Sequence, residues 1–155
     1  MVYLLRIIVR WDMPFHYLDD IAVADVAFQA TGETLEELFS TAAEALLAVM
    51  LEDPGSLGKD AEIRIELEKS ELDLLLFDFL AELIYYKDAR QLLLCVESIK
   101  VETGGDRLRL EATVRGETID RSRHPLLVDV KAVTLHRLHV GKTDAGWEAT
   151  VVLDV

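Results

Sequence analysis

Apolar and polar residues alternate along several short stretches of the chain, which is the pattern of β-strands with one buried face. In the clearest stretch, AEIRIELE at residues 61–68, Ile63, Ile65 and Leu67 fall on one face and charged residues on the other. The turn sequence Gly104-Gly105-Asp106 predicts a hairpin between two such strands. Further strands are predicted from β-branched and aromatic content at residues 3–9, 21–30, 94–102, 107–115, 128–140 and 147–155.

Apolar residues at three- and four-residue steps predict two helices. The first begins after Thr34, whose hydroxyl caps the helix while Glu37 reaches back, an arrangement known as a capping box. Asp53-Pro54-Gly55 ends it, because proline lacks an amide donor and glycine tolerates any backbone angle. The second helix, capped by Ser70, spans about residues 71–86 and is apolar on almost every side. We therefore expect it to lie deep against a sheet or against a partner protein.

The order of these elements (strand, helix, strand, helix and then several strands) predicts the fold class. We expect an α+β fold in two layers, a mostly antiparallel β-sheet with two helices packed on one face. With 155 residues, 51% of them hydrophobic, the chain is long enough for a single domain with one buried core. That domain covers residues 1–155, in which residues 1–12 either add a strand or precede a true start at Met13.

The composition is strongly acidic, since 16 basic and 29 acidic residues give a formal charge of −13. Such a field repels nucleic acid and anionic membranes, and it favours basic proteins or divalent cations as partners. We therefore expect no direct nucleic-acid binding and no membrane association, so any role near RNA runs through another protein. Arg6 and Arg10 interrupt the apolar N-terminus, and no stretch approaches the roughly 20 apolar residues of a membrane span. These features predict a cytoplasmic protein.

The chain lacks the motifs of several enzyme classes. It has no glycine-rich phosphate loop of the G-x-G-x-x-G or G-x-x-x-x-G-K-[ST] type, and no G-x-S-x-G nucleophile elbow. Its lone cysteine, Cys95, excludes an internal disulfide and a C-x-x-C metal or redox motif. His136 and His139 are three apart in a predicted strand, so they point to opposite faces and make poor joint metal ligands. We interpret His16 and His124 as isolated surface or loop histidines.

Carboxylates remain as the candidate functional groups. Asp25 interrupts a stretch suited to burial, where an unpaired carboxylate is costly. Asp154 is the penultimate residue, so its side chain lies close to the α-carboxylate of Val155. If sheet pairing brings Asp25 beside this terminus, three carboxylates converge and suit a hard cation such as Ca²⁺, Mg²⁺ or Mn²⁺. Spacing alone leaves an alternative open, namely an aspartate at a strand bend and an acidic chain end.

The same residues lie in segments that resemble the archease family. Its members share a YLDHTAD segment, a G-[DE]-T-L-E-E-x-F helix start, an HP-x-x-x-x-VKA-x-T strand and an ending of hydrophobic-Asp-hydrophobic form. The corresponding segments here are Tyr17-Leu18-Asp19 with Ala24-Asp25, GETLEELF, HPLLVDVKAVT and VVLDV. The resemblance keeps this order from about Phe15 to Val155, nearly the whole chain.

This resemblance implies an archease-like fold and a role as a protein cofactor, not as an enzyme. The family assists the manganese- and GTP-dependent RNA ligase of tRNA splicing, by promoting ligase guanylylation and multiple turnover. Its metal-binding positions correspond to Asp25, Asp154 and the chain end, Val155. The resemblance therefore implies a calcium site, with Mg²⁺ or Mn²⁺ as alternatives, and the ligase as protein partner. Lys131 matches the lysine of the family's VKA motif.

One segment departs from the family pattern. DDIAVAD, residues 19–25, is two residues longer than D-H-T-A-D and lacks its histidine and threonine. Two extra residues preserve the facing of a strand, since its side-chain period is two, or they form a bulge. This departure leaves open a diverged chaperone-like or scaffolding module, which binds a partner through its apolar second helix without activating a ligase. A second alternative, a metal-dependent hydrolase, lacks a general base beside the carboxylates.

Overall fold

The computed structural model of the chain describes residues 14–18 and 25–155. The predicted strand at residues 3–9, the interpretation of residues 1–12 and residues 19–24 of the DDIAVAD segment lie outside these described residues. The elements, in chain order, are β1 Phe15–Leu18, β2 Asp25–Gly32, α1 Leu35–Met50, the 3₁₀ turn η1 Pro54–Ser56, β3 Ala61–Lys69, α2 Leu72–Arg90, β4 Leu92–Glu102, β5 Leu108–Thr118, β6 Ala132–Val133, β7 His139–Thr143 and β8 Gly146–Asp154.

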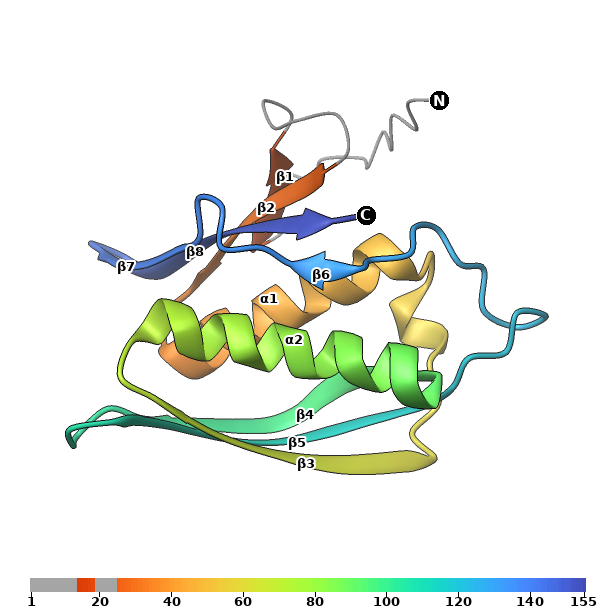
Figure 1. Cartoon of the computed structure of the whole chain (residues 1–155), viewed down its shortest axis with the longest axis horizontal. Coiled ribbons are helices and arrows are strands. Elements are labelled where there is room, and N and C mark those ends of the chain that lie inside the picture. The colour runs from red at the N-terminus through yellow and green to blue at the C-terminus, as the bar shows by residue number, and fades with distance from the viewer. Residues whose placement is uncertain (1–13, 19–24) are drawn as a thin grey trace.

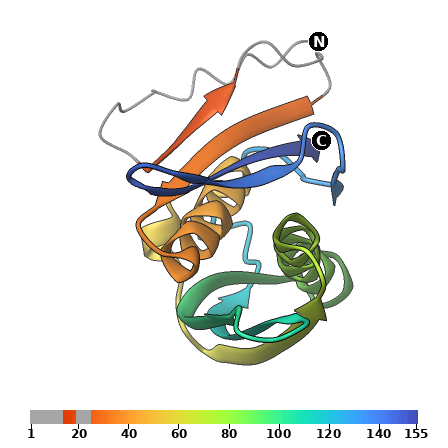
Figure 2. The ribbon, with the colours of Figure 1, turned by 90° about the vertical axis from the view of Figure 1, so that its left-hand side faces the viewer.

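The strands form two antiparallel sheets, and both helices lie between them (Figure 1, Figure 2). The order in the first sheet is β1-β2-β8-β6, with β7 pairing to the same edge of β8 as β6. The order in the second sheet is β3-β5-β4. The predicted α+β class, the two helices and the antiparallel strands are confirmed. The layering differs from the expected two layers, because the strands divide into two sheets that enclose the helices.

The apolar character of α2 explains this third layer. A helix that is apolar on nearly every side needs apolar neighbours on more than one side. α2 contacts β3, β4 and β5 of one sheet and β6 and β7 of the other, and it also packs on α1. Phe79 of α2 stacks on Phe39 of α1, with ring centroids 6.3 Å apart. The residues of α2 that are buried in this way are Leu75, Leu76, Phe79, Leu80, Leu83, Ile84 and Lys87.

The start of α1 has the predicted cap. Thr34 Oγ1 accepts a hydrogen bond from the Glu37 amide at 3.1 Å, and Glu37 Oε2 accepts one from the Glu33 amide at 3.2 Å. The preceding Gly32 has no space for a side chain, since a Cβ there would lie 2.5 Å from the Leu38 nitrogen. The chain thus passes from β2 into α1 in a tight turn, which holds the helix close to the end of the strand.

α2 is longer than predicted. It continues to Arg90, and Gln91 then adopts a left-handed conformation with φ of 54°. The residue before its first turn is Glu71, whose side chain makes no capping hydrogen bond, so the predicted cap at Ser70 is wrong. Neither helix of the described residues has the length and unbroken apolar composition needed to cross a membrane.

The second sheet carries its charges on the face that points away from the helices. β4 and β5 form the predicted hairpin, and β3 pairs with the other edge of β5. The predicted inward residues Ile63, Ile65 and Leu67 belong to the core or pack against it. On the outer face, Arg115 forms ion pairs with Glu62 at 3.1 Å and with Glu97 at 2.7 Å, so one arginine links all three strands.

The predicted strand at residues 128–140 is interrupted. Only Ala132–Val133 and His139–Thr143 pair with β8, and they follow the same edge of that strand in succession. Between them the chain makes a turn in which Arg137 has a φ of 54° and Thr134 Oγ1 donates a hydrogen bond to the Val152 carbonyl at 3.0 Å. His136 therefore lies in a turn and not in a strand, which corrects the expected geometry of the His136 and His139 pair.

Candidate functional site

Asp25 and Asp154 lie directly opposite each other on adjacent strands. They are the first residue of β2 and the last residue of β8, and the antiparallel register pairs them. Directly paired residues project their side chains to the same face of a sheet, with Cβ atoms about 5 Å apart. The structure thus brings together the two aspartates that the sequence hypothesis required to be neighbours. Their role as metal ligands stays a prediction.

Both aspartates occupy the face of the first sheet that points away from the helices. Ala149, Val151 and Leu153 of β8 belong to the core, as predicted, so the alternate residue Asp154 points to the opposite face. Asp25 and Asp154 are both half-buried. Val155 follows directly, and its side chain packs against the core, which holds the end of the chain beside the two carboxylates.

In the part of the chain that the structure describes, no basic side chain pairs with these two carboxylates. Among residues 14–18 and 25–155, neither side chain has a hydrogen-bond or ion-pair partner. Lys131 lies on the other side of β8, where its backbone amide donates to the Asp154 carbonyl at 2.8 Å while its side chain is exposed. Like charges directly opposite each other destabilise an antiparallel sheet. A cation between the carboxylates would remove this repulsion.

The oxygen atoms present fit a hard divalent cation. Ca²⁺ takes six to eight oxygen ligands, and Mg²⁺ keeps several waters beside one or two carboxylates. The His, Cys, Asp and Glu side chains of the described part of the chain form no group of three or more that would hold a metal ion. Two aspartates therefore need the α-carboxylate of Val155, water or a partner as further ligands. Asp19 and Asp20, the remaining acids of this segment, lie outside the described residues.

A second polar cluster surrounds His124. This histidine lies in a loop, as expected, but its side chain is only 1% exposed. Its Nδ1 accepts a hydrogen bond from the Asp120 amide at 2.9 Å, so the proton resides on Nε2, which lies 2.7 Å from Glu117 Oε1. Both ring nitrogens are engaged, and the ring is therefore a structural element and not a free base or metal ligand.

Glu117 is the centre of this cluster. Its Oε1 accepts hydrogen bonds from the Gly58 amide at 2.9 Å, from His124 and from Arg123 at 2.5 Å. The Gly58 amide, His124 and Arg123 together lower the pKa of Glu117 from 4.5 to about 2. We call these four residues the Glu117 clamp. It ties the loop before β3 and the loop after β5 to the end of β5. In the sequence, the His124-Pro125 dipeptide marked this loop, but the burial of the His124 side chain was not predicted.

Comparison with known sequences places these features in a family. Residues 15–155 match the archease protein family (MTH1598/TM1083). The chain is 35% identical to the protein archease of Methanosarcina barkeri, over 91% of this chain and 95% of that protein. It is 33% identical to the protein archease of Archaeoglobus fulgidus, over 92% of this chain and all of that protein.

Comparison with solved structures gives the same assignment. The solution structure of protein 1598 of Methanobacterium thermoautotrophicum has a TM-score of 0.80 and 32% identity, and the match covers 92% of this chain and 99% of that one. The crystal structure of an archease from Thermotoga maritima, described as a possible chaperone, has a TM-score of 0.59 and 21% identity, over 90% and 98% of the two chains. The second likeness shows the shared fold.

Proposed function

The chain belongs to the archease protein family, and on this premise we propose that it is a metal-binding protein cofactor of an RNA ligase. In this proposal it activates the manganese- and GTP-dependent ligase of tRNA splicing, by promoting ligase guanylylation and multiple turnover, and it is not itself an enzyme. The observation that carries the proposal is the direct pairing of Asp25 with Asp154 at the end of β8.

We assign the metal ion to Asp25, Asp154 and the α-carboxylate of Val155. Carboxylate oxygens favour a hard cation, which makes Ca²⁺ the first choice and Mg²⁺ or Mn²⁺ the alternatives. When bound, such an ion neutralises phosphate charge during nucleotidyl transfer. The protein's own residues hold it at the end of β8, on the face of the sheet directed away from the helices.

The charge of the molecule supports a protein partner and not RNA. A formal charge of −13 repels the phosphate backbone, whereas an enzyme that binds RNA presents a basic surface. The cofactor therefore docks on the ligase and has no direct contact with nucleic acid. A protein that acts together with this ligase in tRNA splicing is expected in the cytoplasm.

The test is multiple-turnover RNA ligation with the host's ligase, in the presence and absence of this chain and of Asp25→Asn. We expect the wild-type chain to stimulate turnover and Asp25→Asn to lose the stimulation, with Ca²⁺ binding by calorimetry weakened about tenfold or more. Asp144→Asn is the matched control, because Asp144 is exposed in the turn at the other end of β8. Full stimulation by Asp25→Asn would refute the metal assignment.

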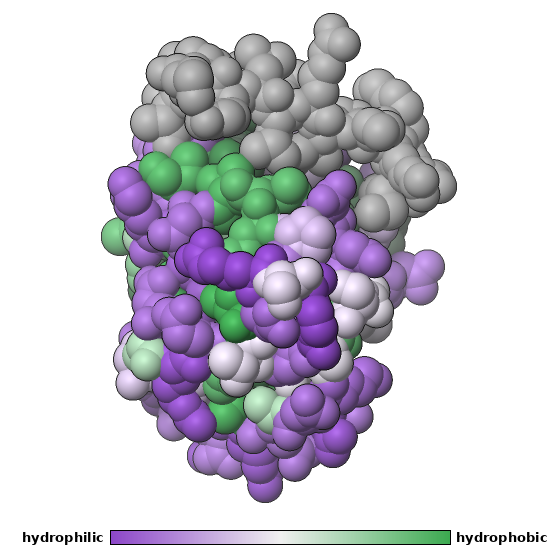
Figure 3. Space-filling model, turned by 90° about the vertical axis from the view of Figure 1, so that its right-hand side faces the viewer, coloured by the Kyte–Doolittle hydropathy of each residue, from purple (hydrophilic) through white to green (hydrophobic). Residues whose placement is uncertain are grey.

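A chaperone-like module is the alternative function, in keeping with the description of the Thermotoga maritima structure. On the face shown in Figure 3, hydrophobic residues gather directly below the residues drawn in grey, and such an area suits contact with another protein. The expected docking route through the second helix is wrong, however, since Leu76 and Phe79 are 0% exposed within this chain's own core. A chaperone-like activity would survive Asp25→Asn, which separates the two functions.

A further inference from the structure

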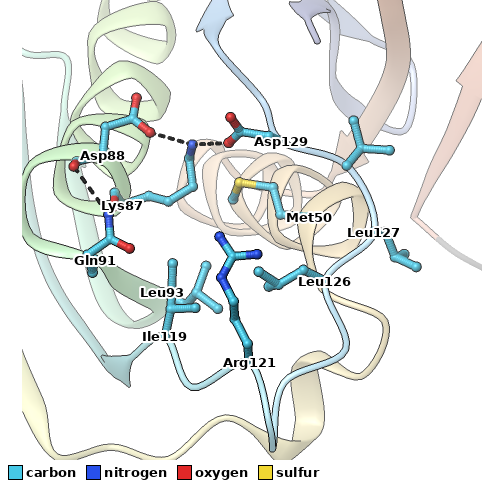
Figure 4. Close-up of a pocket in the computed structure, with 11 residues that line it drawn as sticks. Met50, Lys87, Asp88, Gln91, Leu93, Ile119, Arg121, Leu126, Leu127 and Asp129 are labelled. Carbon is cyan, nitrogen blue, oxygen red and sulfur yellow. Dashed lines mark hydrogen bonds and ion pairs between the residues drawn. The ribbon is translucent and has the colours of Figure 1, made fainter.

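A cavity of about 390 Å³ lies under the loop that joins β5 to β6. It is bounded by the ends of α1 and α2, the start of β4 and loop residues 119–129 (Figure 4). Its volume is in the range of about 300 to 1,000 Å³ that is typical of small-molecule sites. No residue of this cavity belongs to the candidate metal centre or to the Glu117 clamp.

Backbone hydrogen bonds fix the loop on both sides of this cavity. The Leu127 amide donates to the Met50 carbonyl at 2.9 Å, and the Glu52 amide donates to the Pro125 carbonyl at 3.0 Å. At the other side, the Ile119 amide donates to the Gln91 carbonyl at 2.7 Å. The loop is therefore fixed to the ends of both helices, and the cavity is a preformed feature of the fold.

Lys87 places a buried positive charge in the cavity wall. Its side chain is only 7% exposed, and its Nζ lies 2.5 Å from Asp88 and 2.6 Å from Asp129. Burial alone would lower the pKa of this ammonium group, but the hydrogen bonds to Asp129 and Asp88 raise it. An ammonium group has three donors, and two are used here. Within the described residues, the third has no partner.

Arg121 provides a second cationic group at the cavity, and this one pairs with none of the described residues. It lines the cavity, and Figure 4 shows its guanidinium group pointing into the cavity from the loop, on the side of Lys87. None of the described residues forms a hydrogen bond or ion pair with it. By contrast, Arg107, Arg115 and Arg123 all pair with acidic side chains. Arg121 is exposed to solvent at the cavity, and in a chain of charge −13 an arginine that pairs with none of the described residues is available to an external anion.

We propose that this cavity binds a carboxylate carried on a short apolar stem. Arg121 receives the carboxylate, because a guanidinium group matches a planar carboxylate with two parallel hydrogen bonds, and the free donor of Lys87 adds a third. Leu93, Ile119 and Leu126 line the cavity and accommodate the stem. Asp88 and Asp129 at the same site repel a doubly charged phosphate more strongly than a singly charged carboxylate. The site therefore favours a monoanion. The proposal is independent of the function proposed above.

The carboxylate has two sources of the same chemistry, a free small acid and the C-terminus of a peptide. The test is an NMR titration of the ¹⁵N-labelled chain with hexanoate, with hexanol, and with a peptide ending in leucine whose C-terminus is free or amidated. We expect hexanoate or the free peptide to shift the amides of Leu93, Ile119 and Leu126, and hexanol and the amidated peptide to leave them unchanged. The acid that binds more tightly, either hexanoate or the peptide with a free C-terminus, identifies the source of the carboxylate.

Two variants and a control make this test specific. Arg121→Gln should weaken carboxylate binding about tenfold or more, and Val128→Phe should block it by filling the cavity without a change of charge. Arg109→Gln is the matched control, since Arg109 is exposed on β5 in the second sheet, and it should bind like the wild type. Absence of shifts with both acids, equal shifts with hexanol, or unchanged binding by a folded Arg121→Gln variant would overturn the proposal.

Discussion

At the scale of single residues, Glu117 shows how a carboxylate can be structural in a molecule whose candidate function also depends on carboxylates. One of its oxygens receives an amide, an imidazole and a guanidinium group, whereas Asp25 and Asp154 receive no hydrogen bond from the described residues. A satisfied carboxylate fixes the position of loops, and an unsatisfied one remains available for an external cation. This contrast separates the Glu117 clamp from the candidate metal centre.

The Glu117 clamp makes stability depend on acidic pH. Because the pKa of Glu117 is about 2 in the folded chain and 4.5 without its partners, the unfolded state binds the proton more readily. The stabilisation is therefore complete above about pH 4.5 and is lost as the pH falls toward about 2. Urea unfolding measured across this range should show that Glu117→Gln loses less stability on acidification than the wild type. Parallel curves for the two proteins would contradict the clamp.

The candidate site was only partly predictable from single residues. Asp25 and Asp154 were identified because a carboxylate in an apolar stretch and one at a chain end are visible in the sequence. The burial of His124 and Lys87 was not predicted, because it depends on tertiary contacts, for Lys87 one with Asp129 on a loop far along the chain. Periodicity reports the faces of helices and strands, and it carries no information on which loop covers them.

At the scale of elements, α2 packs against both sheets, as α1 also does. Its apolar residues were predicted to pack against a sheet or a partner protein, and in the structure they are buried within the chain's own core. Leu76→Asp places an uncompensated carboxylate in the core and should reduce the free energy of unfolding by about 4 kcal/mol or more. Chemical denaturation followed by circular dichroism measures this loss.

The control for this prediction lies on the same helix. Tyr85 is 56% exposed, so Tyr85→Asp should change the stability by about 0.5 kcal/mol or less. A folded, fully stable Leu76→Asp variant would show that this face of α2 is not the interior of the molecule.

The elements themselves followed from local patterns, and their arrangement did not. Thr34 and Glu37 marked the start of α1, and alternation marked β3 and β8, because caps and strand facing are decided within a few residues. The interruption between β6 and β7 was not predicted. The turn at Thr134 and Arg137 depends on contacts with β8, which are not visible in the local sequence. The division into two sheets likewise depends on packing between distant segments.

At the scale of the whole molecule, the charge of −13 determines how a partner approaches. Attraction to a basic enzyme accelerates association and is screened by salt, since the Debye length falls from about 10 Å at 0.1 M to about 3 Å at 1 M. The association rate with the ligase proposed as partner, measured by stopped-flow fluorescence, should fall about tenfold between low and high salt. RNA alone should show no binding at any salt concentration. A salt-independent rate would contradict electrostatic docking.

The pairing of β2 with β8 also sets the order in which the molecule assembles. Asp25 and Asp154 close a loop of about 130 residues, whereas β4 and β5 meet across a short turn. Chain entropy delays such distant contacts, so we expect the second sheet to form early and β8 to join late. Because β8 pairs with β2, β6 and β7, the first sheet is complete only when β8 is in place. A cation held between Asp25 and Asp154 would then fasten the strand that we expect to join last.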